Sequence, residues 1–119
     1  MTDPDCIFCK IARGEIPAKK VHEDEDVLAF HDARPQAPVH LLLIPKEHVP
    51  SLYEAGTAQQ RALGKMLALA GELARKEGAG EGFRAIINTG RVGHQEVYHL
   101  HMHVLGGPEP LGPMLQRKR

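Results

Sequence analysis

The sequence has little that would suit a membrane, a nucleic acid or an extracellular fold. Its 15 basic and 15 acidic residues balance, so it lacks the excess positive charge that a nucleic-acid-coating protein needs. No apolar run approaches the ~18 residues that span a bilayer, and residues 1–5 are too polar and acidic for a secretory signal. With only two cysteines, Cys6 and Cys9, we expect a reducing, cytoplasmic setting without a structural disulfide.

What is present predicts one globular domain over residues 1–119, with 42% hydrophobic and 25% charged residues. Apolar patterning between turn residues predicts helices over 7–13 and 57–77, and strands over 20–23, 27–31, 40–44, 83–88 and 97–105. This order, with short connections, predicts an α+β domain with a mostly antiparallel sheet. We expect residues 1–5 to be flexible and residues 108–119 to form an extended tail.

The long helix has a helical apolar period and two internal glycines. Its expected core positions are Leu63, Met66, Leu67, Ala70, Leu73 and Ala74. Thr57 and Gln60 fit a capping box at its start, and Gly78 suits its end. Gly64 and Gly71 are seven residues apart on one face, which indicates close packing there, for instance at a subunit interface.

Eight histidines are many for a chain of this length, and three of them alternate with apolar residues near its end. On a strand, His99, His101 and His103 would share one face while Leu100 and Met102 enter the core. Three interpretations fit: a solvated face, a metal site, or nucleophilic attack on phosphorus by the central imidazole. Near pH 7 a histidine is largely unprotonated, as such attack requires.

The alternating segment matches the pattern His-φ-His-φ-His-φ, where φ is apolar, and other motifs accompany it. With them the chain resembles the histidine triad superfamily, and within it the histidine triad nucleotide-binding branch, over roughly residues 6–107. The accompanying motifs are Ile16-Pro17-Ala18, Leu28-Ala29-Phe30-His31-Asp32, Pro35-Gln36-Ala37-Pro38, His40, Ile44-Pro45-Lys46, Val97-Tyr98-His99 and Leu105-Gly106-Gly107.

The resemblance implies an antiparallel sheet of about five strands with one long and one short helix. It also implies a homodimer whose sheets join, with Gly64 and Gly71 at the interface. The expected substrate is a purine nucleotide with an AMP or GMP moiety, in particular a nucleoside 5′-phosphoramidate cleaved at its α-phosphate. No catalytic metal is expected, because the sequence has no evident acidic cluster for Mg²⁺.

The resemblance also assigns roles to individual residues. His101 is the expected nucleophile, which forms a nucleotidyl-histidine; His103 would contact the phosphate and assist the leaving group, and His40 would support them by hydrogen bonding. The other nucleotide-binding positions are Ile7, Phe8, Ile11, Phe30 and Leu42 around the base, His31 beside them, Asp32 on the ribose, and Asn88, Gln95, Glu96 and Val97 toward ribose and phosphate. For the apolar members, core packing is the alternative interpretation.

The Cys6-x-x-Cys9 spacing is half of a zinc site, and by itself it also fits two buried thiols. In several relatives and in the related nucleotidyl transferases, two cysteines bind zinc with a histidine after the third strand and the first histidine of the triad. Those positions correspond to His48 and His99 here. We therefore expect a structural Cys₂His₂ zinc site.

The chain departs from the family pattern at the cleft and at its end. Glu96 stands where a serine or threonine is common, His94 stands where glycine is common, and the tail lacks the tryptophan of some members. These differences leave the leaving group open. Two alternative functions also fit: a dinucleoside polyphosphate hydrolase, and a nucleotide-binding scaffold with incidental catalysis. Gly106-Gly107 favours the phosphoramidate branch over the first.

Overall fold

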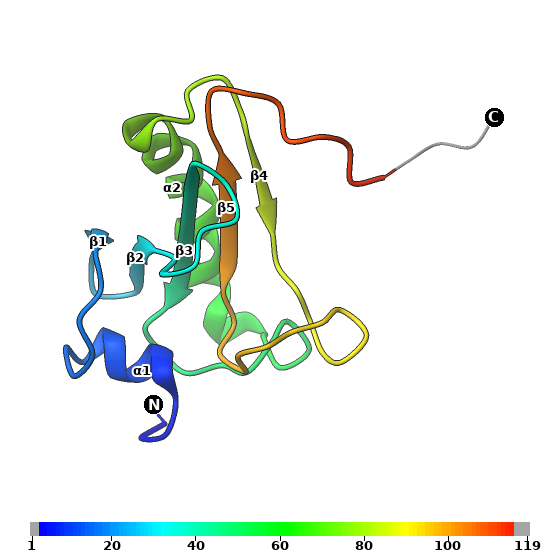
Figure 1. Cartoon of the computed structure of the whole chain (residues 1–119). Coiled ribbons are helices and arrows are strands. Elements are labelled where there is room, and N and C mark those ends of the chain that lie inside the picture. The colour runs from blue at the N-terminus through cyan, green and yellow to red at the C-terminus, as the bar shows by residue number, and fades with distance from the viewer. Residues whose placement is uncertain (1–2, 116–119) are drawn as a thin grey trace.

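A computed structural model describes residues 3–115 as a five-stranded antiparallel sheet with one long and one short helix. The strands have the order β1-β2-β3-β5-β4, and Figure 1 shows them with helix α2 behind the central pair. The elements are α1 (Ile7–Ala12), β1 (Lys20–Glu23), β2 (Val27–His31), β3 (Val39–Pro45), a 3₁₀ turn (Thr57–Gln59), α2 (Gln60–Glu77), β4 (Phe83–Ile86) and β5 (Met102–Gly106). The predicted fold class is confirmed.

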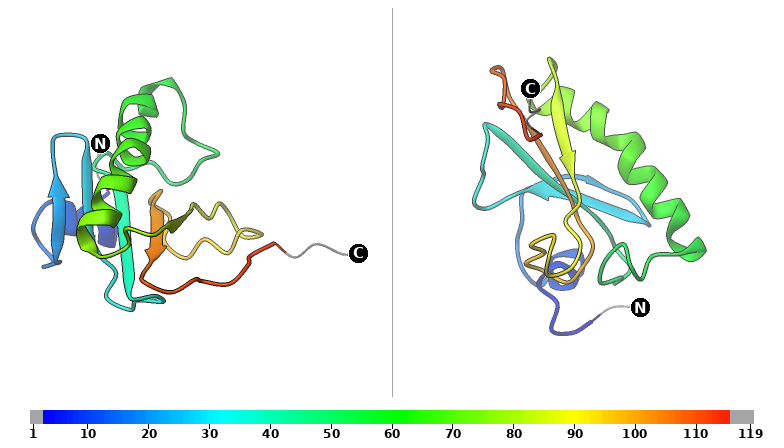
Figure 2. Two further views of the ribbon diagram at one scale, coloured as in Figure 1. Left: turned by 90° about the horizontal axis from the view of Figure 1, so that it is seen from above. Right: turned by 90° about the vertical axis from the view of Figure 1, so that its right-hand side faces the viewer.

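The central strand β3 is buried on both faces, which separates two apolar cores. Because side chains alternate along a strand, Leu41 and Leu43 enter the core under α2, whereas Leu42 and Ile44 enter a second core with Phe8 of α1. Figure 2 shows α2 lying along one side of the sheet and α1 apart from it. The second core is the one that supports the candidate site.

The long helix differs from its sequence prediction at its start and on one face. The Gly56 N–H donates to Gln59 Oε1 over 2.7 Å, so one half of a capping box lies one residue before the predicted Thr57–Gln60 pair, ahead of a 3₁₀ turn. Leu67 is wrongly predicted as core, since it is 63% exposed. A Cβ at Gly64 would meet nothing within 4 Å, so packing within this chain does not explain that glycine.

The histidine segment is only partly a strand. The prediction of a strand over 97–105 is wrong for its first half, because β5 begins at Met102, and β4 ends at Ile86 rather than at residue 88. Before β5 the Leu100 N–H donates to the carbonyl of Val49 over 2.8 Å, outside the sheet ladder. The loop that includes residue 49 therefore holds the chain away from β4 at this point.

The two ends of the chain lie partly outside the described residues. Residues 1–2 of the segment expected to be flexible, and residues 116–119 of the expected tail, are not described. Over residues 108–115 the chain has no helix or strand and runs away from the sheet (Figure 1). Among residues 3–115, no helix is both long and apolar enough to cross a membrane.

Candidate active site

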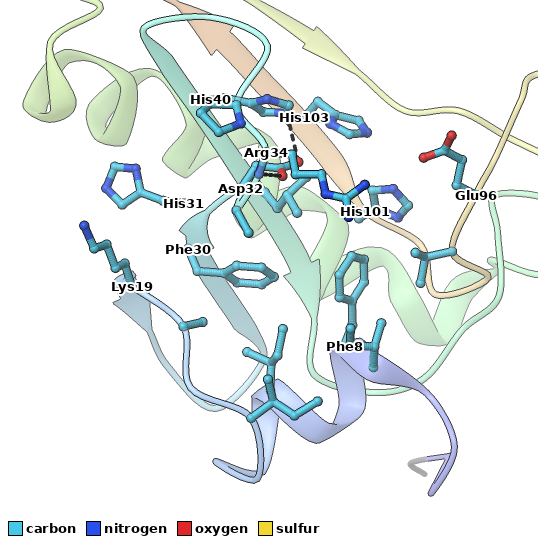
Figure 3. Close-up of a pocket in the computed structure, with 18 of the residues that line it drawn as sticks. Phe8, Lys19, Phe30, His31, Asp32, Arg34, His40, Glu96, His101 and His103 are labelled. Carbon is cyan, nitrogen blue, oxygen red and sulfur yellow. Dashed lines mark hydrogen bonds and ion pairs between the residues drawn. The ribbon is translucent and has the colours of Figure 1, made fainter.

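A cleft of about 1150 Å³ opens beside the second core, between α1, the ends of β2 and β3, and the loop before β5. Phe8 and Phe30 pack edge to face in it with their ring centroids 5.8 Å apart. Phe8 also packs edge to face against His101, with ring centroids 5.1 Å apart (Figure 3). The cleft brings together most of the predicted site: Ile7, Phe8, Ile11, Phe30, His31, Asp32, His40, Leu42, Asn88, Glu96, Val97, His101 and His103.

His101 is buried, and a backbone hydrogen bond sets the tautomer of its neutral ring. Its Nδ1 lies 2.7 Å from the carbonyl oxygen of His99, to which only a protonated Nδ1 can donate. A neutral ring with its proton on Nδ1 has an unprotonated Nε2 with a free lone pair. Because the ring lines the cleft and is only 6% exposed, His101 can present a nucleophilic nitrogen in a largely dry setting.

A second chain of hydrogen bonds sets the tautomers of His40 and His103. The Gln36 N–H donates to His40 Nδ1 over 3.0 Å, so the proton of His40 sits on Nε2. That Nε2 lies 2.9 Å from His103 Nδ1 and donates to it, which leaves the proton of His103 on its own Nε2. Asp32 Oδ2 lies 3.4 Å from the same His40 Nε2.

Burial keeps both of these rings neutral. Burial, together with a smaller effect of the neighbouring His101 and His40 rings, lowers the pKa of His103 to about 4. Burial also lowers the pKa of His40, while the Asp32 carboxylate opposes that change. Near pH 7 the pair therefore holds one transferable proton on each ring and no net charge.

Asp32 and Gln95 differ in how they relate to the cleft. Asp32 lines it, and its Oδ1 accepts from the Arg34 N–H over 2.8 Å, which orients the carboxylate. Gln95, by contrast, does not line the cleft. Its Nε2 donates to the carbonyls of Pro50 and Val97 over 2.7 and 3.0 Å, so it is a buried brace for the loop.

Four predicted metal ligands meet at the base of the site. The ligand atoms of Cys6, Cys9, His48 and His99 all lie within 4.8 Å of one another, so this cluster could hold a metal ion. His99 Nδ1 lies 3.3 Å from Cys6 Sγ and 3.5 Å from Cys9 Sγ, and His48 Nδ1 lies 3.5 Å from Cys9 Sγ.

Neighbouring groups orient these four side chains. His99 Nε2 donates to the carbonyl of Pro45 over 2.7 Å, which leaves its Nδ1 unprotonated and directed at the sulfurs. The Asp3 N–H donates to Cys9 Sγ and the Cys9 N–H donates to Cys6 Sγ, each over 3.4 Å. The contact from Asp3 favours the thiolate of Cys9, the form that binds metal, although burial raises the pKa of this thiol overall.

Several lining residues were not found from the sequence. Lys19, Arg34 and His94 line the cleft, and the main-chain N–H of Gln36 sets the tautomer of His40. Only His94 carried a sequence signal, since it replaces a common glycine of the family pattern. A contact made by a backbone N–H leaves no trace in residue type, so the role of Gln36 needed the structure.

Comparisons with known proteins agree with this geometry. The family model described as "HIT domain" matches residues 13–109. Purine nucleoside phosphoramidase of Escherichia coli K12 is 50% identical over 115 residues, covering 96% of both chains, and protein HitA of Neisseria gonorrhoeae is 52% identical over 104 residues, covering 87% of this chain and 97% of its own. A HIT family hydrolase from Clostridium thermocellum superposes with a TM-score of 0.90 at 40% identity, covering 97% of this chain and all of that one.

Proposed function

The chain belongs to the HIT domain family and is a nucleotide hydrolase, and on that basis we propose that it hydrolyses purine nucleoside 5′-phosphoramidates through a nucleotidyl-histidine at His101. The observation that carries this proposal is the Nδ1–H bond from His101 to the His99 carbonyl, which leaves Nε2 free toward the cleft. The name of the 50% identical Escherichia coli relative supports the same substrate class.

In the first step, His101 Nε2 forms a bond to the α-phosphorus while the phosphorus–nitrogen bond breaks. The electron pair of that bond returns to the amine nitrogen, which takes a proton from solvent and departs as a neutral amine, while the His103 Nε2–H would donate to a phosphate oxygen. His40 donates to His103 Nδ1 and so keeps the proton of His103 on its Nε2.

In the second step, water attacks the phosphorus and its proton is released to solvent. The bond between phosphorus and His101 Nε2 breaks, and the products are the nucleoside monophosphate and the free enzyme. Apolar contact with Phe8 and Phe30 would hold the base, and Asp32 would accept from the ribose hydroxyls, as carboxylates do. Asn88 and backbone N–H groups around Val97 would contact the phosphate.

Replacing His101 with alanine tests the nucleophile. We expect His101→Ala to lower kcat for an AMP–amine conjugate by at least about 10³-fold, as for other covalent nucleophiles, while AMP binding and the melting temperature change little. Cleavage at the normal rate would contradict the assignment. Comparing the same conjugate with a diadenosine polyphosphate would separate a phosphoramidase from a polyphosphate hydrolase.

We also propose that the metal at Cys6, Cys9, His48 and His99 is zinc with a structural role. Tetrahedral zinc, with bonds of about 2.3 Å to sulfur and 2.05 Å to nitrogen, separates its sulfur and nitrogen ligands by about 3.6 Å. The separations of 3.3 to 3.5 Å found here agree with that value. Four protein ligands fill a tetrahedral site, so zinc would fix α1 to the segment before β5. Both cysteines are free thiols, which suits a reducing cytoplasm.

We propose a homodimer formed through α2 and β4. Gly64, Leu67 and Gly71 follow one another along one face of α2, and Phe83 of β4 lies 4.0 Å from where a Gly71 Cβ would be. Leu67 and Phe83 are 63% and 39% exposed, so this apolar surface is open in one chain. Leu67→Glu should convert a dimer to a monomer in sedimentation experiments; a wild-type monomer would contradict the proposal.

A further inference from the structure

The acidic residues that line the cleft are unevenly placed, and one of them lies where the leaving amine would depart. Two acidic residues line it among residues 3–115: Asp32 and Glu96. The Asp32 carboxylate already accepts a hydrogen bond from the Arg34 main-chain N–H and lies close to the His40 ring. Figure 3 shows Glu96 on the other side of His101 from Phe30, with its carboxylate toward the open cleft.

The loop that carries Glu96 is built to hold it in that position. Gln95 is buried and bonded to three backbone groups, those of Gly90, Pro50 and Val97, so it anchors the loop. The side chains on either side of it project outward: that of His94 is 86% exposed and that of Glu96 is 80% exposed. His94 adopts a left-handed backbone with φ of 63°, which is sparsely populated for a residue with a Cβ.

The substrate geometry directs the leaving group toward this loop. In the proposed complex the nucleoside would occupy the apolar part of the cleft at Phe8 and Phe30, and the α-phosphorus would lie at His101. The amine is attached to phosphorus and not to the nucleoside, so in this complex it would extend away from the apolar part, on the side where Glu96 lines the cleft. The carboxylate also acts on the reaction centre, since it raises the pKa of His103, although burial and nearby rings lower that pKa more strongly.

We propose that Glu96 selects leaving amines that carry a second positive charge. Its Oε2 lies 3.5 Å from the Nε2 of the neighbouring His94. This inference rests on the proposed phosphoramidase function. The carboxylate attracts the distal ammonium and takes no part in bond making: the phosphorus–nitrogen bond still breaks at His101, and the distal charge does not change. Glu96 is therefore a specificity-determining residue rather than a proton donor.

Three AMP phosphoramidates that differ only at the far end of the amine test the inference. The amines are 1,4-diaminobutane linked through one nitrogen, n-butylamine, and 4-aminobutyrate, which carry a positive, neutral and negative end. For the wild-type protein at low salt we expect kcat/KM to fall in that order, by about two- to fivefold per step, as for partly exposed charge pairs. The preference should shrink as ionic strength rises.

Charge variants assign the preference to a residue. Glu96→Gln should remove the advantage of the ammonium substrate, so that kcat/KM becomes nearly equal on the ammonium and butylamine substrates, and Glu96→Lys should reverse the order. Glu25→Gln makes the same change in net charge outside the cleft, at an exposed turn residue, and should keep the wild-type order. Since Glu96 is mostly solvated, these variants should fold like the wild type.

Four outcomes would overturn the inference, and they differ in what else they affect. Equal rates on all three substrates overturn it alone, as does an equal loss on all three in Glu96→Gln, which would indicate proton transfer instead. A preference for the carboxylate substrate that disappears in Arg34→Gln would assign the selectivity to Arg34 instead of Glu96. Hydrolysis of none of the three would overturn the proposed function itself.

Discussion

The Nδ1 of His101 lies 2.7 Å from the carbonyl oxygen of His99, and the ring of His99 in turn lies among the metal-ligand cluster. One residue thus orients the nucleophile through its backbone and joins the N-terminal helix through its side chain. The position of the reactive nitrogen depends on how firmly His99 is held. Catalysis and the integrity of the cluster should therefore be coupled.

Removing metal should destabilise the fold. A ligand bound at 1,000 times its dissociation constant adds about 4 kcal/mol of stability, which corresponds to a melting-temperature change of about 10–20 °C for a domain of this size. We expect a chelator to lower the melting temperature by that amount and zinc to restore it. In Cys6→Ser, where one ligand is lost, the chelator should have little further effect. Protein purified without chelator that contains no zinc would contradict the prediction.

The hydrogen bond from the Gln36 N–H to His40 can be removed without changing a histidine. Gln36→Pro eliminates the donor, so His40 Nδ1 can take up the proton and Nε2 can no longer donate to His103. We expect kcat to fall about tenfold or more with KM nearly unchanged, as for other groups that orient a reacting side chain. Gln36→Ala keeps the N–H and should act as wild type. Equal kinetics in the two variants would refute the role of this bond.

These relationships mark the limit of what the sequence could predict. Strands β1 and β2 have the bounds expected from the sequence, because the acidic turn between them and their apolar patterns are local signals. The start of β5 depends on a contact with the distant carbonyl of Val49, which local periodicity does not reveal. Leu67 has the helical period of the core and is nevertheless exposed, because periodicity does not say how wide the buried face of a helix is. The histidine and cysteine motifs predicted which groups gather, but not the tautomers, which depend on backbone atoms.

Stability should fall in mild acid in a way that can be traced to His103. In the unfolded chain a histidine titrates near pH 6.5, whereas burial lowers the pKa of folded His103 to about 4. Between these values the unfolded state binds the extra proton, so the free energy of unfolding decreases as pH falls. Thermal unfolding between pH 7 and 4.5 should show a shallower decrease in His103→Gln than in the wild type. Identical slopes would contradict this.

The turn between β1 and β2 depends on Asp24. Its Oδ1 accepts from the N–H groups of Asp26 and Val27 over 2.7 and 2.9 Å, and its Oδ2 lies 2.7 Å from His22 Nε2. Burial acts to raise the pKa of this carboxyl, but these hydrogen bonds together hold it well below its usual range. Asp24→Ala should lower the free energy of unfolding by about 1–3 kcal/mol in urea titration. The neighbouring Glu25→Ala should cost less than about 0.5 kcal/mol, and similar losses in both would count against the turn contacts.

The covalent intermediate is the most direct test of the proposed chemistry. Wild-type protein mixed with an AMP–amine conjugate and quenched within milliseconds in alkali, where phosphohistidine persists, should carry one adenylate, which peptide mass spectrometry should locate on His101. The adduct should be absent in His101→Ala and should accumulate when the second step is slowed. A full turnover with no adduct, or an adduct on His103 or another residue, would contradict the assignment of His101 as the nucleophile.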